Sequence, residues 1–202
     1  MAVSDVSICN RALQKLGSTT RLTSLDDDNS KARALNLAYE PVRRAELRKR
    51  IWRFAIARDS LPALADAPDS DFDYQYELPN DYLRLLPGGD LRTTASLDDY
   101  IDSVTGLYSV EGHQILTNLE APLAIRYLRD VTDAASFDSC FVELLAAALA
   151  LECCEEITES ASKKQELRQD YMQCMRDAAR ANAFEKASEK SQDDSWITSR
   201  QQ

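Results

Sequence analysis

Many residues of this chain could act as acids, bases or nucleophiles, but few of them form a catalytic pattern. His113 is the only histidine among 202 residues, so a Ser-His-Asp arrangement has a single candidate base. It follows Glu111-Gly112, in a turn-like sequence where a solvated histidine is the expected role. Acidic residues number 34, and a hydrolase needs only two carboxylates, so their presence does not indicate one. The sequence therefore predicts a protein that is not an enzyme.

Metal and nucleotide sites are not indicated either. The cysteines have neither a CxxC pair nor zinc-ligand spacing, which favours reduced thiols that pack as small apolar groups. They are Cys9, Cys140, Cys153, Cys154 and Cys174. Residues 26–29, three Asp followed by one Asn, lack the alternating ligands and central glycine of an EF-hand loop and are better explained as helix N-capping. Gly88-Gly89 is too short for a phosphate-binding loop. We expect no metal and no cofactor.

Charge is unevenly distributed along the chain. The net charge of −10 argues against a general nucleic-acid binder. Residues 31–58, however, contain nine Lys or Arg and only two Glu, so this segment carries +7 and the remainder carries −17. Such asymmetry favours a surface that meets a complementary partner, although a solvated helix face gives the same pattern. The candidate partner-facing residues are Arg43, Arg44, Arg48, Lys49 and Arg50. A DNA-binding protein that uses residues 31–58 is an alternative.

Membrane insertion and secretion are not predicted. The longest apolar run, residues 144–151, is much shorter than the roughly 18 residues that a membrane helix needs. The N-terminal residues lack the basic and apolar regions of a signal peptide, so we expect the chain to fold in a cytosol.

Helical periodicity occupies both ends of the chain. A first helix is expected to begin after Ser4 or Asp5 and to end before Gly17. A second runs from about residue 28 to residue 50, with a kink or break near Pro41. A strongly apolar helix beginning near Ala134 and a final helix over residues 161–185 follow later.

The middle of the chain predicts short strands and turns. The strand candidates are residues 74–78, 82–86, 107–110, 114–117 and 123–128. The expected fold is therefore α+β: a mainly helical core from residues 1–53 and 133–185, with a small antiparallel β subdomain, residues 54–132, inserted into it. The polar residues 186–202 are expected to form an extended C-terminal arm. Its Trp196 and Ile197 could anchor the arm on a partner, fold back on the same chain or remain solvated.

Five groups of short motifs occur in order along nearly the whole chain. They are residues 8–13 with 16–17, residues 39–43 with 47–48 and 52–55, residues 76–84, residues 111–118, and residues 125–127 with 131–133. Together they resemble the tail tubular protein A, or head-to-tail adaptor (gatekeeper), family of short-tailed bacteriophages. No single motif among them is catalytic.

The resemblance implies a structural role in a virion tail, after assembly in the host cytoplasm. It implies a ring of 12 subunits that joins the portal protein above to a nozzle resembling tail tubular protein B below, with viral DNA passing through the lumen and no membrane involved. The matched residues Trp52, Phe54, Leu78, Pro79 and Tyr82 would then fix the junction of helices and sheet. The candidates for portal docking are Trp196, Ile197 and Arg200 in the C-terminal arm. A cell-wall hydrolase carried on the tail is the second alternative.

Overall fold

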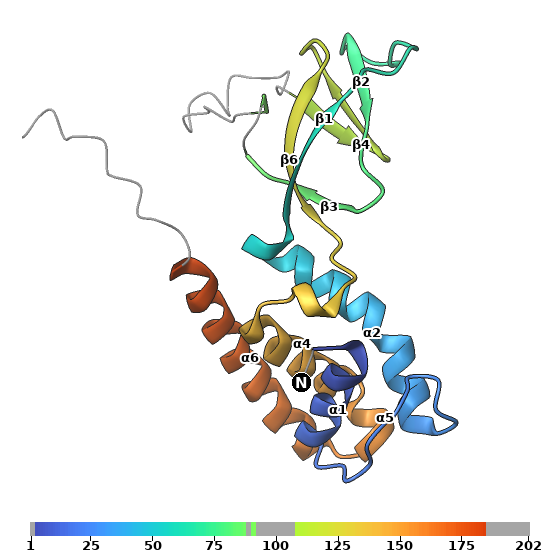
Figure 1. Ribbon diagram of the computed structural model, residues 1–202, viewed down its shortest axis with the longest axis vertical. Coiled ribbons are helices and arrows are strands. Elements are labelled where there is room, and N and C mark those ends of the chain that lie inside the picture. The colour runs from blue at the N-terminus through green and yellow to red at the C-terminus, as the bar shows by residue number, and fades with distance from the viewer. Residues whose placement is uncertain (1–2, 88–89, 92–107, 185–202) are drawn as a thin grey trace, which may run out of the picture.

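A computed structural model of the chain describes residues 3–87, 90–91 and 108–184. The helices are α1 (Asp5–Lys15), α2 (Ser30–Lys49), α4 (Ser139–Glu152), α5 (Cys154–Thr158) and α6 (Ala161–Phe184), with 3-10 turns η1 (Arg53–Ala55) and η2 (Ala134–Ser136). The strands are β1 (Ile56–Leu61), β2 (Tyr74–Glu77), β3 (Tyr82–Leu85), β4 (Tyr108–Glu111), β5 (Gln114–Thr117) and β6 (Leu123–Arg129). Figure 1 shows the strands stacked above the helices, which come from both chain ends. The predicted α+β class is confirmed.

Helix α4 is the centre of the helical part. Residues 144–150 are all buried, because α4 packs against α1, α2 and α6. A helix that is apolar on every side gains most when other helices surround it. Asp138 caps its N-terminus by accepting hydrogen bonds from the Cys140 and Phe141 amides at 2.8 and 3.3 Å. This arrangement leaves α1, α2 and α6 on the surface, where they can meet partners.

Helix α1 has both of the predicted end signals. Ser4 accepts a hydrogen bond from the Ser7 amide, and the Ser7 hydroxyl accepts one from the Ser4 amide, which forms a capping box. Gly17 has a φ of 78°, and the Ser18 amide bonds back to the Leu13 carbonyl at 2.9 Å. Glycine suits this left-handed position because it has no Cβ.

The β part contains two three-stranded antiparallel sheets among the described residues. One has the order β1-β6-β3 and the other β2-β5-β4. The predicted hairpin is β4 and β5, with Gly112 at a φ of 59°. A core of its own lies between the sheets: Leu61, Tyr76, Leu78, Leu91, Ile115, Leu123, Ile125 and Tyr127.

An aromatic cluster lies where the β part meets the helices. Trp52 packs edge-on against Phe141 with 5.0 Å between ring centroids, and Phe54 lies 5.1 Å from the same ring. The Trp52 indole also donates a 3.0 Å hydrogen bond to the Glu46 carbonyl. Phe137 closes the cluster at 5.2 Å from Phe141. Trp52 and Phe54 therefore bind the end of α2 to α4.

The secondary structure differs from the sequence expectations in three details. Helix α2 runs through Pro41, so a break there is wrong, while a kink at this position stays a prediction. Proline removes the hydrogen bond to the Leu37 carbonyl, but Leu37 and Pro41 are both exposed, so water can satisfy that carbonyl. The helix expected from Ala134 is divided into η2, α4 and α5. In addition, β1 had not been expected.

Candidate interaction surfaces

The basic segment does not form one charged face. Arg43 is only 6% exposed, and its Nη2 donates to both Asp130 carboxylate oxygens at 2.9 and 3.0 Å. Assigning Arg43 to a partner-facing surface was therefore wrong, because a desolvated arginine needs a buried counter-charge and Asp130 supplies it. Arg44 lies on the exposed side, with Nε at 3.5 Å from Asp130 and Nη1 at 3.8 Å from Glu40.

The other three candidate residues, Arg48, Lys49 and Arg50, differ in whether their side chains are paired within the chain. Lys49 contacts Glu46, donates to the Tyr171 hydroxyl at 2.9 Å and lies over the Tyr171 ring. Burial alone would lower the pKa of Lys49, but the hydrogen bonds to Glu46 and Tyr171 outweigh it, so the pKa is raised. Arg48 and Arg50 are exposed and have no ion pair among the residues that the structure describes. Among the five candidate partner-facing residues, these two are therefore the ones fully available to a partner.

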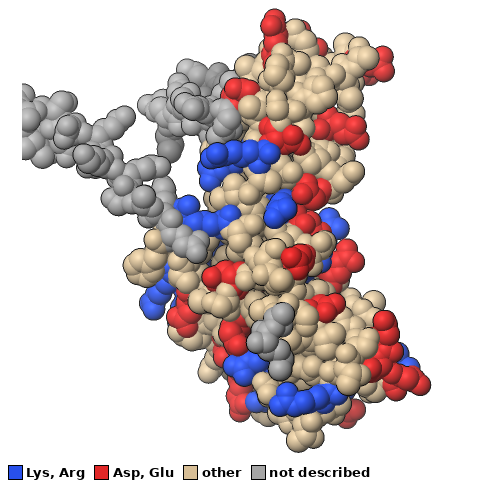
Figure 2. Space-filling view, viewed as in Figure 1, with Lys and Arg blue, Asp and Glu red and all other residues tan. Residues whose placement is uncertain are grey.

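A second basic surface lies on the outer face of the β1-β6-β3 sheet. Arg58 on β1 is directly opposite Arg126 on β6. Arg84 on β3 is paired with Leu128, which lies two positions after Arg126 on β6. Like charges placed opposite each other destabilise a sheet unless an anion offsets them. None of the three arginines has an ion pair within the described ranges. Figure 2 shows Lys and Arg side chains around the junction of the β part and the helices. We call Arg58, Arg84 and Arg126 the arginine face.

The outer side of α2 carries an apolar stripe. Leu37, Pro41 and Ala45 follow one another at intervals of four residues, and Leu37 is 82% exposed. A pocket of about 480 Å³ lies beside them, lined also by Cys153 and rimmed by Glu156. Exposed contiguous apolar surface often marks a protein interface. The sequence analysis did not single out this stripe.

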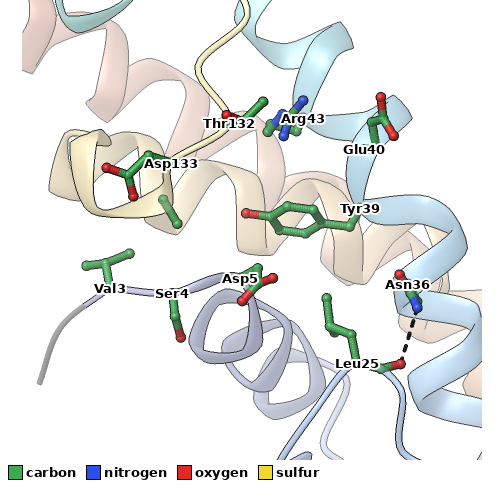
Figure 3. Close-up of a pocket in the computed structure, with 11 residues that line it drawn as sticks. Val3, Ser4, Asp5, Leu25, Asn36, Tyr39, Glu40, Arg43, Thr132 and Asp133 are labelled. Atoms are coloured by element: carbon green, nitrogen blue, oxygen red, sulfur yellow. Dashed lines mark hydrogen bonds between the residues drawn. The ribbon is translucent and has the colours of Figure 1, made fainter.

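A polar pocket of about 510 Å³ separates the start of α1 from α2 and the linker after β6 (Figure 3). The Tyr39 ring points across it, and neither the Tyr39 hydroxyl nor Arg43 Nε has a hydrogen-bond partner among the described residues. Burial raises the pKa of Tyr39 to about 12, so its hydroxyl stays a donor at neutral pH. Asp5 and Asp133 add carboxylates to the wall. The pocket thus suits a small polar group.

This pocket has no arrangement for nucleophilic catalysis among its lining residues. The Ser4 hydroxyl is used to cap α1, and no histidine or cysteine lines the cavity. Within the described part of the chain, no group of three His, Cys, Asp or Glu side chains is placed to hold a metal. His113 lies on the β4–β5 turn, exposed, with its ring 6.4 Å from that of Tyr82.

All five cysteines are free thiols. Burial raises the pKa of Cys9 to about 12 and that of Cys153 to about 11. A thiol reacts as its thiolate, so both are poor nucleophiles at neutral pH. Their positions in the helical core agree with the predicted packing role.

The residues of the sequence motifs lie at structural positions, in packed clusters and in a turn. Leu78 is buried between the sheets, while Pro79 and Tyr82 form the turn into β3, where the Tyr82 amide donates to the Pro79 carbonyl at 2.9 Å. Trp52 and Phe54 belong to the aromatic cluster described above. The arm candidates Trp196, Ile197 and Arg200 lie outside the described residues.

No protein-family model matches the chain, and no curated protein matches it by sequence. No described helix is both long and apolar enough to cross a membrane.

Proposed function

We propose that this protein is a structural head-to-tail adaptor of a phage virion and not an enzyme. In this role, copies of the chain form a ring, with 12 subunits by the family pattern. The ring joins a portal protein to a tail nozzle, and viral DNA passes through its lumen. The proposal begins from the ordered motifs, which resemble the adaptor family over nearly the whole chain.

The observation that carries the proposal is a pair of unlike surfaces on one subunit, one apolar and exposed, the other basic and partly exposed. The apolar stripe of Leu37, Pro41 and Ala45 lies on α2 beside α5. The arginine face lies on the β1-β6-β3 sheet. A closed ring needs two different patches on each subunit, because each copy meets its two neighbours through opposite sides. A globular protein that works alone would gain little from exposing Leu37 at 82%.

The test is assembly with the portal. Purified chain is mixed with the portal protein of the same phage, and the mass of the complex is measured by light scattering while negative-stain images are collected. We expect a ring of adaptor on one end of the portal. A chain that stays monomeric in the presence of portal would overturn the proposal.

DNA binding is the second candidate, and the arginine face is the observation that favours it. Arg58, Arg84 and Arg126 could neutralise phosphates, although the acidic remainder of the chain opposes this. A salt-sensitive gel shift that is lost in Arg58→Gln and Arg84→Gln would support DNA binding as the main function. Absence of any shift at low salt would exclude it.

A further inference from the structure

A pocket of about 520 Å³ lies where α6 ends against the junction of the two parts. One wall is apolar, formed by Ile51, Ile56 and Leu86, and the other is basic, formed by Arg53 and Arg126. Among the residues that the structure describes, no acidic side chain lines it. Arg126 donates to the Pro87 carbonyl at 3.4 Å, while its buried Nε has no hydrogen-bond partner among the described residues. The pocket therefore fits a peptide that combines carboxylates with large apolar side chains.

The end of α6 is fixed at the rim of this pocket. The Asn182 side chain accepts a 3.0 Å hydrogen bond from the Arg53 amide and donates a 2.7 Å bond to the Ile51 carbonyl. Arg53 Nε also donates to the Asn182 carbonyl at 3.3 Å. The described part of α6 therefore ends beside the pocket, at Phe184, which is itself 88% exposed.

The sequence that follows has the complementary chemistry. Asp193 and Asp194 are followed closely by Trp196 and Ile197. Carboxylates form charge-assisted hydrogen bonds with guanidinium groups, and an indole packs well on both arginine and aliphatic side chains. We propose that residues 193–197 of the same chain bind in this pocket. Their carboxylates face Arg53 and Arg126, and Trp196 and Ile197 lie on the wall of Ile51, Ile56 and Leu86.

The length of the connecting chain and the effective concentration it gives both favour residues 193–197 of the same chain over other occupants of the pocket. Eight residues separate Phe184 from Asp193, and the nine steps between their Cα atoms span up to ~30 Å when extended, at about 3.3 Å per residue. A short tether gives an effective concentration of roughly millimolar, which exceeds that of a second copy at ordinary protein concentration. A DNA backbone would use the arginines but not the apolar wall.

The inference stands independently of the proposed function. If the adaptor role also holds, Trp196 has two competing sites, the pocket in the free subunit and the portal in the assembled virion. Portal binding would then release the segment from its pocket.

The test measures how accessible Trp196 is in the full-length chain. Trp52 is 1% exposed, and subtracting the signal of a Trp196→Phe variant isolates the fluorescence of Trp196. We expect acrylamide to quench Trp196 at least threefold less than it quenches a free peptide of residues 188–202. Equal quenching in the chain and the peptide would overturn the proposal.

Three variants and a dilution series identify the occupant. Asp193→Asn with Asp194→Asn changes no residue that the structure describes, so it leaves the folded part intact and should raise quenching at least threefold. Arg126→Gln should do the same, while Arg33→Gln, an exposed arginine on α2, is the matched control and should change nothing. Unchanged quenching in the double Asp variant would refute the pocket assignment. Protection that disappears on dilution would assign the pocket to a second copy and overturn binding within one chain.

Discussion

Arg43 on α2 and Asp130 after β6 form a buried ion pair that joins the helical part to the β part. Their side chains are only 7% and 12% exposed, and they lie 87 positions apart in the sequence. The Asp130 amide also donates to the Asp81 carbonyl at 2.6 Å, so this carboxylate is held from the β side as well. The pair limits how far the β part can turn relative to α2. In the proposed adaptor, this pair would keep the two parts at a fixed angle.

Replacing Asp130 with Ala should destabilise the protein by about 3–5 kcal/mol, because it leaves the Arg43 guanidinium buried without a counter-charge. Urea denaturation followed by circular dichroism measures this. The matched control is Glu40→Gln, which removes only the exposed 3.8 Å contact to Arg44 and should cost less than about 1 kcal/mol. If both variants lose the same free energy of unfolding, burial of the Arg43–Asp130 pair contributes nothing to stability.

Replacing Trp52 with Ala should cost about 3–5 kcal/mol, because the indole is fully buried against Phe141. Trp52→Phe keeps the ring packing but leaves the Glu46 carbonyl without its indole donor, so it should cost less. The free energies of unfolding of both variants can be compared with that of Phe184→Ala, an exposed aromatic whose loss should be nearly neutral. A neutral Trp52→Ala would mean that the aromatic cluster does not hold the junction.

Local signals predicted much of this fold. Ser4 and Gly17 bracket α1, and Gly112 marks the β4–β5 turn, because each acts within a few residues of its own position. Strand β1 was missed because its sequence, IARDSL, does not alternate cleanly, and it exists only by pairing with β6 far along the chain.

The surfaces were less predictable because they depend on contacts between residues that are far apart in the sequence. Helical geometry turns Arg43 and Glu46 inward while Arg44 and Arg48 face outward, so a run of charges is not one face. The partner of Arg43 is also distant in sequence. The arginine face could not be predicted from composition. It depends on the register between β1 and β6, which places Arg58 opposite Arg126.

Replacing Leu37 with Glu should leave the stability of the free chain within about 0.5 kcal/mol, because the side chain is exposed. It should nevertheless reduce assembly with the portal at least tenfold if the apolar stripe is an interface between subunits. Light scattering of the mixture measures assembly. Met172→Glu on α6, another exposed apolar position, is the matched control and should assemble normally. Normal assembly of Leu37→Glu would exclude the stripe from the ring interface.

The protein should lose stability steadily as the pH rises from about 9 to about 12. Burial raises the pKa of Cys9 and of Tyr39 to about 12, above the ordinary values of 9.0 and 10.0 that apply in the unfolded chain. In this range the unfolded chain releases protons while the folded chain keeps them, so raising the pH favours unfolding. Urea midpoints across this range measure the slope. In the Cys9→Ala variant, the urea midpoint should fall less steeply with pH. An unchanged slope would show that other groups cause the loss of stability.

The cysteines should react with iodoacetamide in an order set by burial. Cys140, half-buried at the start of α4, should react first near neutral pH. Cys9 and Cys153 are buried, and their pKa values of about 12 and about 11 leave little thiolate, so their labelling should be at least tenfold slower. Peptide mass spectrometry over a time course reads each site separately. In urea the five rates should converge, because unfolding exposes every thiol. Rapid labelling of Cys9 in the native chain would contradict the packing of α1 against α4, since that contact is what shields its sulfur.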